Sequence, residues 1–137
     1  MDNVVFENIT LNVKSSSYIG IIAYNTSEEL SNITLKNITI TGGVSYVAGL
    51  CGYTTSGDFH DITADNIQIS ATGSYVAGIF GYVIERSVYL LDTLSISNST
   101  ITSKGSYIGG VIGYGRGEEF ESINNNISGD SYVGGVI

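Results

Sequence analysis

One nine-residue string recurs along the chain and constrains its fold more than any other feature. Ser-Tyr-Val-Ala-Gly-Leu-Cys-Gly-Tyr occupies residues 45–53, and close copies occupy residues 74–82 and 106–114. A copy one residue shorter lies at 17–24, and a partial copy lies at 131–137. The tyrosine after the serine therefore recurs at positions 18, 46, 75, 107 and 132. Repetition at a period of about 20 to 50 residues is the signature of a solenoid or a related repeat architecture.

The segment before this string repeats as well, so each unit is longer than nine residues. Three blocks of 24 residues, 30–53, 59–82 and 91–114, align without a gap, and shorter copies occupy 6–24 and 120–137. The tyrosine spacing gives units of roughly 29 residues. We expect a single domain over residues 1–137, because a chain of this length builds one hydrophobic core and is short for two.

Within each unit, apolar and polar residues alternate with a period of two. Ile38 and Ile40 alternate with Thr39 and Thr41, which is the pattern of a half-buried strand rich in β-branched residues. Glycine and asparagine punctuate the runs at recurring places, as expected at corners, and the sequence has no Asn-Gly or Asp-Gly hairpin turn. The sequence therefore predicts an all-β fold, a parallel β-helix (β-solenoid) of four to five coils with roughly 29 residues per coil.

The repeat resembles the GLUG motif. Its core, Gly-Gly-Val-Ile-Gly-Tyr at residues 109–114, follows Ser-Tyr-Ile and precedes a polar turn and the strand Glu-Ser-Ile-Asn-Asn-Asn at residues 121–126. The chain departs from the motif at residues 21–23, where both core glycines are missing. GLUG arrays occur in large bacterial surface and secreted proteins. The resemblance implies an extracellular or cell-surface repeat segment and carries over no catalytic residue.

Charge and hydropathy exclude several classes of partner. Thirteen acidic residues against five basic ones give a net charge of −8, whereas nucleic acids and anionic membranes require a basic face. No apolar run reaches the roughly 18 residues of a membrane span. The first ten residues lack the basic and apolar regions of a signal peptide. We expect no nucleic-acid partner, no membrane span and no signal peptide in this chain.

The residues with reactive side chains do not form a catalytic pattern. Cys51, the single cysteine, aligns with apolar residues of the other units, which predicts a buried side chain. His60, the single histidine, aligns with variable polar residues, which predicts a solvated surface position. We therefore expect a protein that is not an enzyme. A remnant of a polysaccharide-acting β-helix enzyme remains an alternative.

Acidic residues gather just before the blocks and would stack along one edge of a solenoid. They are Glu28, Glu29, Asp58, Glu118 and Glu119. Carboxylate oxygens suit Ca²⁺. The interpretation we favour is a solvated acidic edge, with weak calcium binding as the alternative and no other cofactor.

Two kinds of aligned residue point to contacts between coils. One is an asparagine column in which side-chain amides would bond from coil to coil, formed by Asn37, Asn66 and Asn98. The other is a pair of tyrosine columns on either side of the glycine-rich string, formed by Tyr46, Tyr75, Tyr107 and Tyr132 and by Tyr53, Tyr82 and Tyr114. Stacked tyrosines stabilise neighbouring coils, whereas outward-facing ones would form a binding stripe. The string between the two columns is apolar on both faces, which predicts that one face meets a lateral partner or a neighbouring domain.

These features predict a structural or adhesive repeat segment at a cell surface or outside the cell. Its partners would be neighbouring repeats of the same array, or further copies stacked head to tail into a filament. The alternative is a module that binds a glycan or a host protein through exposed tyrosines.

Overall fold

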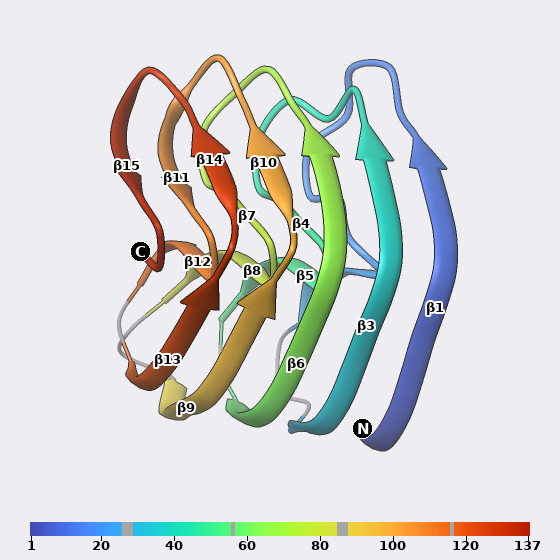
Figure 1. Ribbon diagram of the computed structural model, residues 1–137, viewed down its shortest axis with the longest axis vertical. Helices are drawn as coiled ribbons and strands as arrows, with labels where there is room; N and C mark the ends of the chain where they lie inside the picture. Colours follow the sequence, from blue (N-terminus) through green and yellow to red (C-terminus); the bar gives the residue numbers. More distant parts are fainter. Residues whose placement is uncertain (26–28, 56, 85–87, 116) are drawn as a thin grey trace.

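The computed structural model describes residues 1–25, 29–55, 57–84, 88–115 and 117–137, and these residues form fifteen strands without a helix. The strands pair in parallel across three sheets that the chain visits in turn, once per coil (Figure 1). Strand partners lie about one repeat unit apart; for example, Leu30 pairs with Phe59 and Tyr53 with Tyr82. The chain is therefore a β-solenoid of about four turns with a spacing of roughly 29 residues, as the sequence predicts.

The first sheet, sheet A, contains the long strand of every coil. Its members are β1 (Asp2–Asn12), β3 (Leu30–Thr41), β6 (Gly57–Ser70), β9 (Val88–Ser97), β10 (Thr100–Thr102), β13 (Glu118–Ile123) and β14 (Asn126–Ser128). In Figure 1 these strands run side by side from β1 at the amino end to β13 and β14 at the carboxyl end. Each long strand bends at residues with positive φ, such as Asn32 (φ 51) and Asn37 (φ 55) in β3. Asparagine is among the side chains that tolerate this left-handed conformation best.

Two sheets of short strands complete each coil. Sheet B contains β4 (Val47–Ala48), β7 (Val76–Ala77), β11 (Ser106–Gly109) and β15 (Ser131–Gly134). Sheet C contains β2 (Ile22–Asn25), β5 (Cys51–Thr54), β8 (Phe80–Val83) and β12 (Ile112–Tyr114). Ile19 adds to sheet B through an isolated bridge to Val47. Among the described residues, sheet C thus has strands in four coils, and sheets A and B also have strands in a fifth.

The core runs along the axis between the three sheets. Columns of aliphatic side chains from sheet A, such as Ile40, Ile69 and Ile101, are buried. Phe59 and Phe80 face each other across the interior with ring centroids 5.0 Å apart. Cys51 is buried as predicted, and its thiol lies 3.2 Å from the carbonyl oxygen of Tyr53. The interior is therefore continuous from coil to coil, which is how a solenoid buries a core that no single unit could form.

The apolar string between the tyrosine columns is not one strand, which makes the prediction of a lateral partner face wrong. The chain leaves sheet B after Ala48 and enters sheet C at Cys51, so it turns at Gly49 and Leu50. Val47, Ala48, Leu50 and Cys51 are all fully buried. A turn places consecutive side chains against one core, so no apolar outer face remains.

The strand register adds detail to the outer repeats. Phe6 pairs with Leu35, and Phe120 pairs with Leu94, so β1 and β13 begin before these phenylalanines. At the corner before sheet B the first coil has one residue more than the second, because Asn12 pairs with Thr41 but Ile19 pairs with Val47; it has one residue fewer between sheets B and C, where Ile22 pairs with Cys51. The last coil has one residue fewer than the fourth at the corner before sheet B, because Thr102 pairs with Ser128 and Ser106 with Ser131. The outer copies therefore differ in length at corners, where loop length is free, rather than in a strand, where the register is fixed.

Candidate functional site

The most regular surface feature is a double column of nine tyrosines, which we call the tyrosine ladder. Column one has one ring per coil and consists of Tyr18, Tyr46, Tyr75, Tyr107 and Tyr132. Column two consists of Tyr24, Tyr53, Tyr82 and Tyr114. The first column lies at the beginning of sheet B, just before its strands in the inner coils and within β11 and β15, and sheet C holds the second column, so the corner between the two sheets brings the columns together.

Rings within each column stack face to face along the axis. Tyr75 lies 5.0 Å from Tyr46 and 5.1 Å from Tyr107 between ring centroids, with interplanar angles of 7° and 6°. This distance matches the strand spacing, so the backbone register brings the rings into contact. Rings of different columns meet edge to face; Tyr75 and Tyr82 are 5.1 Å apart at 81°. Both arrangements are favourable for aromatic pairs.

Every tyrosine of column one adopts a left-handed backbone conformation, with φ between 52° and 62°. An aromatic residue is unusual there, because its Cβ crowds the following carbonyl group. The same strained conformation in five coils indicates that the ring contacts offset its cost. No propensity signal in the sequence could have revealed it.

The ladder is a structural contact along most of its length. Tyr46, Tyr75 and Tyr107 are only partly accessible, and their ring faces are covered by the adjacent rings. Burial, together with the neighbouring phenols, raises the pKa of Tyr53, Tyr75 and Tyr82 above the usual value. The faces of these inner rings, on which a sugar would stack, are therefore occupied by the neighbouring tyrosines.

The predicted asparagine column forms, except that one amide bonds to an aspartate instead of to the next asparagine. The amide of Asn66 donates to Asn37 Oδ1 at 2.9 Å, and that of Asn37 donates to Asn8 Oδ1 at 3.0 Å. Gln68 donates to Asn66 Oδ1, and the amide of Asn98 bonds instead to Asp65 Oδ1 at 2.8 Å. The column also continues to Asn124, whose amide donates to Asn98 Oδ1. The sequence comparison missed Asn8 and Asn124, although both are asparagines at the equivalent corner.

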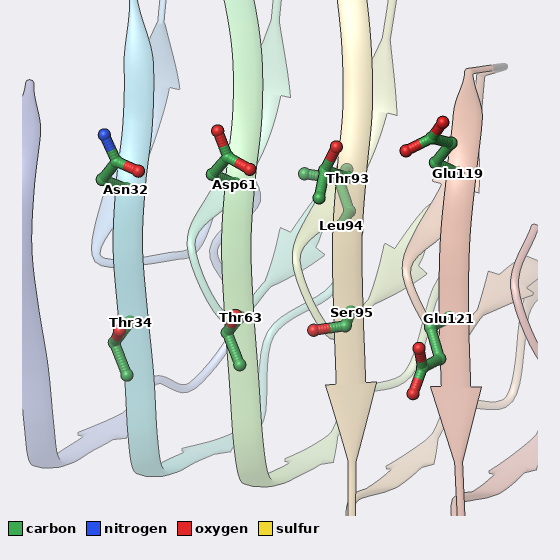
Figure 2. A pocket seen from close by; sticks show the side chains of 9 residues that line it. All are labelled: Asn32, Thr34, Asp61, Thr63, Thr93, Leu94, Ser95, Glu119 and Glu121. Carbon is green, nitrogen blue, oxygen red and sulfur yellow. The ribbon is translucent and has the colours of Figure 1, made fainter.

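A second surface feature is a polar groove on the outer face of sheet A, with a volume of about 440 Å³ (Figure 2). Two rows of side chains cross β3, β6, β9 and β13 and line it: Asn32, Asp61, Thr93 and Glu119 in one row, and Thr34, Thr63, Ser95 and Glu121 in the other. The first row again has positive φ throughout. The groove therefore offers amide, hydroxyl and carboxylate groups at the strand spacing.

His60 lies beside this groove and bonds to carboxylates through both ring nitrogens. Nδ1 is 2.8 Å from Asp61 Oδ2, and Nε2 is 3.4 Å from Glu29 Oε1 in the preceding coil. These bonds, chiefly the one to Asp61, raise the pKa of His60. His60 is thus partly buried and bridges two coils, rather than being fully solvated.

The predicted calcium ligands are not brought together as a set. Within the described ranges, no three His, Cys, Asp or Glu side chains lie where they could share a metal ion. Glu29 pairs with His60, and Glu118 and Glu119 are exposed in β13. Asp58 Oδ1 is buried without a hydrogen-bond partner in the part of the chain that the structure describes. Glu28 lies outside the described residues.

Comparisons with protein-family models, with curated proteins and with solved structures found no significant match. In the described ranges, no helix has the length and apolar character needed to cross a membrane.

Proposed function

We propose that this chain is a non-catalytic structural segment, a rigid column of a protein that is secreted or displayed at a cell surface. One observation carries the proposal: the tyrosine ladder repeats its contacts in every coil. A catalytic or ligand-binding centre concentrates unusual groups at one place, whereas this arrangement is periodic along the axis. The contacts connect each coil to the next, as in a load-bearing rod.

The polar groups favour the same role. Asparagine amides bond along the axis through Asn8, Asn37 and Asn66. Serines do so as well: the backbone N–H groups of Ser74 and Ser106 each bond to the serine hydroxyl of the preceding coil. Coil-to-coil hydrogen bonds and aromatic stacking resist shear between neighbouring units. The resemblance to the GLUG motif supports a place outside the cell.

Replacement of three central ladder rings tests the proposal. The triple variant Tyr46→Ala, Tyr75→Ala and Tyr107→Ala loses stacking in three successive coils and should have a much lower melting temperature. The matched triple variant to phenylalanine keeps the rings and should melt close to the wild type. Circular dichroism measures both. An alanine variant that melts like the wild type but loses binding to a glycan array would make the ladder a recognition surface and overturn the proposal.

A second candidate function, glycan recognition, is favoured by the polar groove. Carbohydrate hydroxyls pair with carboxylate, amide and hydroxyl groups, and Asp61, Thr63 and Glu121 supply these at spaced positions. Isothermal titration against neutral and acidic polysaccharides tests it, with Asp61→Ala as the variant expected to lose binding. The same panel, with and without calcium, tests the absence of polysaccharide hydrolysis.

A further inference from the structure

The tyrosine ladder forms one continuous network of phenol rings along the axis. Within each column, the centroids of successive rings are 4.7 to 5.2 Å apart. Between the columns, edge-to-face pairs are 5.1 to 6.0 Å apart. We propose that the ladder is a radical relay, which moves a one-electron oxidation from ring to ring through the coils. This function goes beyond the structural one, because stacking alone needs no phenol hydroxyl group.

The composition makes the ladder the place where a one-electron oxidation is held. The chain contains ten tyrosines, nine of them in the ladder, and no tryptophan, the other aromatic side chain that loses an electron readily. Its single cysteine, Cys51, is fully buried, and the thioether of its single methionine, Met1, loses one electron less readily than a phenol. In the described part of the chain, the ladder therefore holds the accessible groups that are most readily oxidised by one electron.

Transfer between two rings moves one electron and exchanges one proton with water. The neutral radical of one tyrosine takes an electron from the next phenol and a proton from water, and so becomes a phenol again. The donor ring releases its phenolic proton to water and becomes the radical. The tyrosines of the inner coils are partly accessible, so water reaches these residues. An oxidant of the class of a peroxidase haem or a small inorganic radical takes the first electron, and a soluble reductant such as ascorbate returns one to the last radical.

The contacts between the inner coils suit this exchange. Electron transfer falls steeply with distance, so rings that touch exchange electrons fastest. Tyr75 has a stacked ring on either side, at 5.0 and 5.1 Å, and edge contacts with Tyr82 and Tyr114 at 5.1 and 6.0 Å. Because every carrier is a tyrosine with the same kinds of ring neighbour, the radical has nearly the same free energy at each step. The second column gives a parallel route, so both columns must be interrupted to stop the relay.

A defined start and a defined trap test the relay within one molecule. Tyr18→Trp places in the first coil an indole, which azide radicals from pulse radiolysis oxidise faster than a phenol. Replacement of Tyr107 by 3,4-dihydroxyphenylalanine places a more easily oxidised ring three strand spacings away, or roughly 15 Å. Time-resolved absorption follows the radical of this trap. We expect a fast rise whose rate does not depend on protein concentration, because the transfer takes place within one chain.

The matched control keeps the rings between start and trap but removes their hydroxyl groups. Tyr46, Tyr53, Tyr75 and Tyr82 are replaced together by phenylalanine, which stacks but cannot form this radical, and the fast rise should be lost. A second variant replaces only Tyr75 and Tyr82 and should slow the rise, so the test stands even where the fourfold variant does not fold. Circular dichroism shows which variants are folded. The trap protein that keeps Tyr18 measures direct oxidation of the trap from solution.

Three results would overturn the proposal. One is an equally fast rise in the phenylalanine variants, because the electron would then cross directly between start and trap. The second is the lack of a fast rise with the full ladder. The third is a rate that increases with protein concentration, because the transfer would then occur between molecules. The phenylalanine variants keep the stacked rings, so none of these results bears on the structural function, which the alanine variants test.

Discussion

Replacement of Tyr75 by alanine should destabilise the protein more than the same replacement at Tyr132. Tyr75 stacks on two rings, at 5.0 and 5.1 Å, and also meets Tyr82 and Tyr114 edge to face. Tyr132 stacks on one ring, at 4.7 Å, and is 71% exposed. At about 0.5–1.5 kcal/mol for each stacked pair, Tyr75→Ala loses about 1–3 kcal/mol through stacking alone. Tyr132→Ala loses about half as much.

Because the backbone of Tyr75 is left-handed, the usual order of stability of an alanine and a glycine variant should be reversed at this position. Its φ is 62°, which costs a residue with a Cβ roughly 1 kcal/mol and costs glycine almost nothing. Tyr75→Gly should therefore be more stable than Tyr75→Ala by about 1 kcal/mol, although glycine in an ordinary strand is the less stable of the two.

Urea denaturation followed by circular dichroism measures these differences, with comparable m-values as the condition for comparing them. Tyr75→Phe is the control and should unfold near the wild type, because it keeps the ring. The reasoning is refuted if Tyr75→Ala costs no more than Tyr132→Ala. It is equally refuted if Tyr75→Gly is the less stable of the two Tyr75 variants, since strain would then not be released.

Three further predictions concern the backbone and the charges between coils. Gly81→Ala should lower the free energy of unfolding by about 1–3 kcal/mol, because the added Cβ would lie 2.5 and 2.7 Å from two carbonyl oxygens. Gly135→Ala is the control and should be nearly neutral, because its Cβ would meet only a hydroxyl at 3.9 Å. Urea denaturation measures both variants, and equal costs would contradict the prediction. The raised pKa of His60 means that its stabilising contribution is complete below the unfolded value of about 6.5 and is lost as pH rises through the folded pKa. The difference in melting temperature between the wild type and His60→Gln should therefore be larger at pH 6 than at pH 9, and a difference independent of pH would argue against the bridge. Hydrogen bonds from Asn98 and Ser97 lower the pKa of Asp65. The contribution of Asp65 to stability is therefore present above the unfolded pKa of about 3.9 and is lost as pH falls through the folded pKa. In melting curves recorded at several pH values, Asp65→Asn should remove that part of the loss of stability in acid.

The repeat in the sequence was sufficient to predict the coils. Aligned residues such as Ile38 and Ile67, or Tyr53 and Tyr82, become direct partners in the sheets. This follows because each coil advances by one strand spacing, so one repeat in sequence becomes one neighbour in space. The same reasoning located the asparagine column and both tyrosine columns.

Prediction from the sequence was wrong where the chain turns. Alternation and length could not show that the apolar string bends at Gly49 and Leu50, since a buried strand and a buried corner are equally apolar. The contact of His60 with Glu29 was also missed, because Glu29 belongs to the preceding coil. The sequence alignment around the outer copies could not decide at which corners these copies differ in length from the inner ones.

The sequence by itself determined which residues are neighbours along the axis, because a periodic chain with one strand spacing per coil leaves no freedom in that direction. Only the tertiary structure decided how those neighbours face each other across the coil. The ring orientation depends on the left-handed backbone of Tyr18, Tyr46 and their equivalents, which packing imposes against local preference.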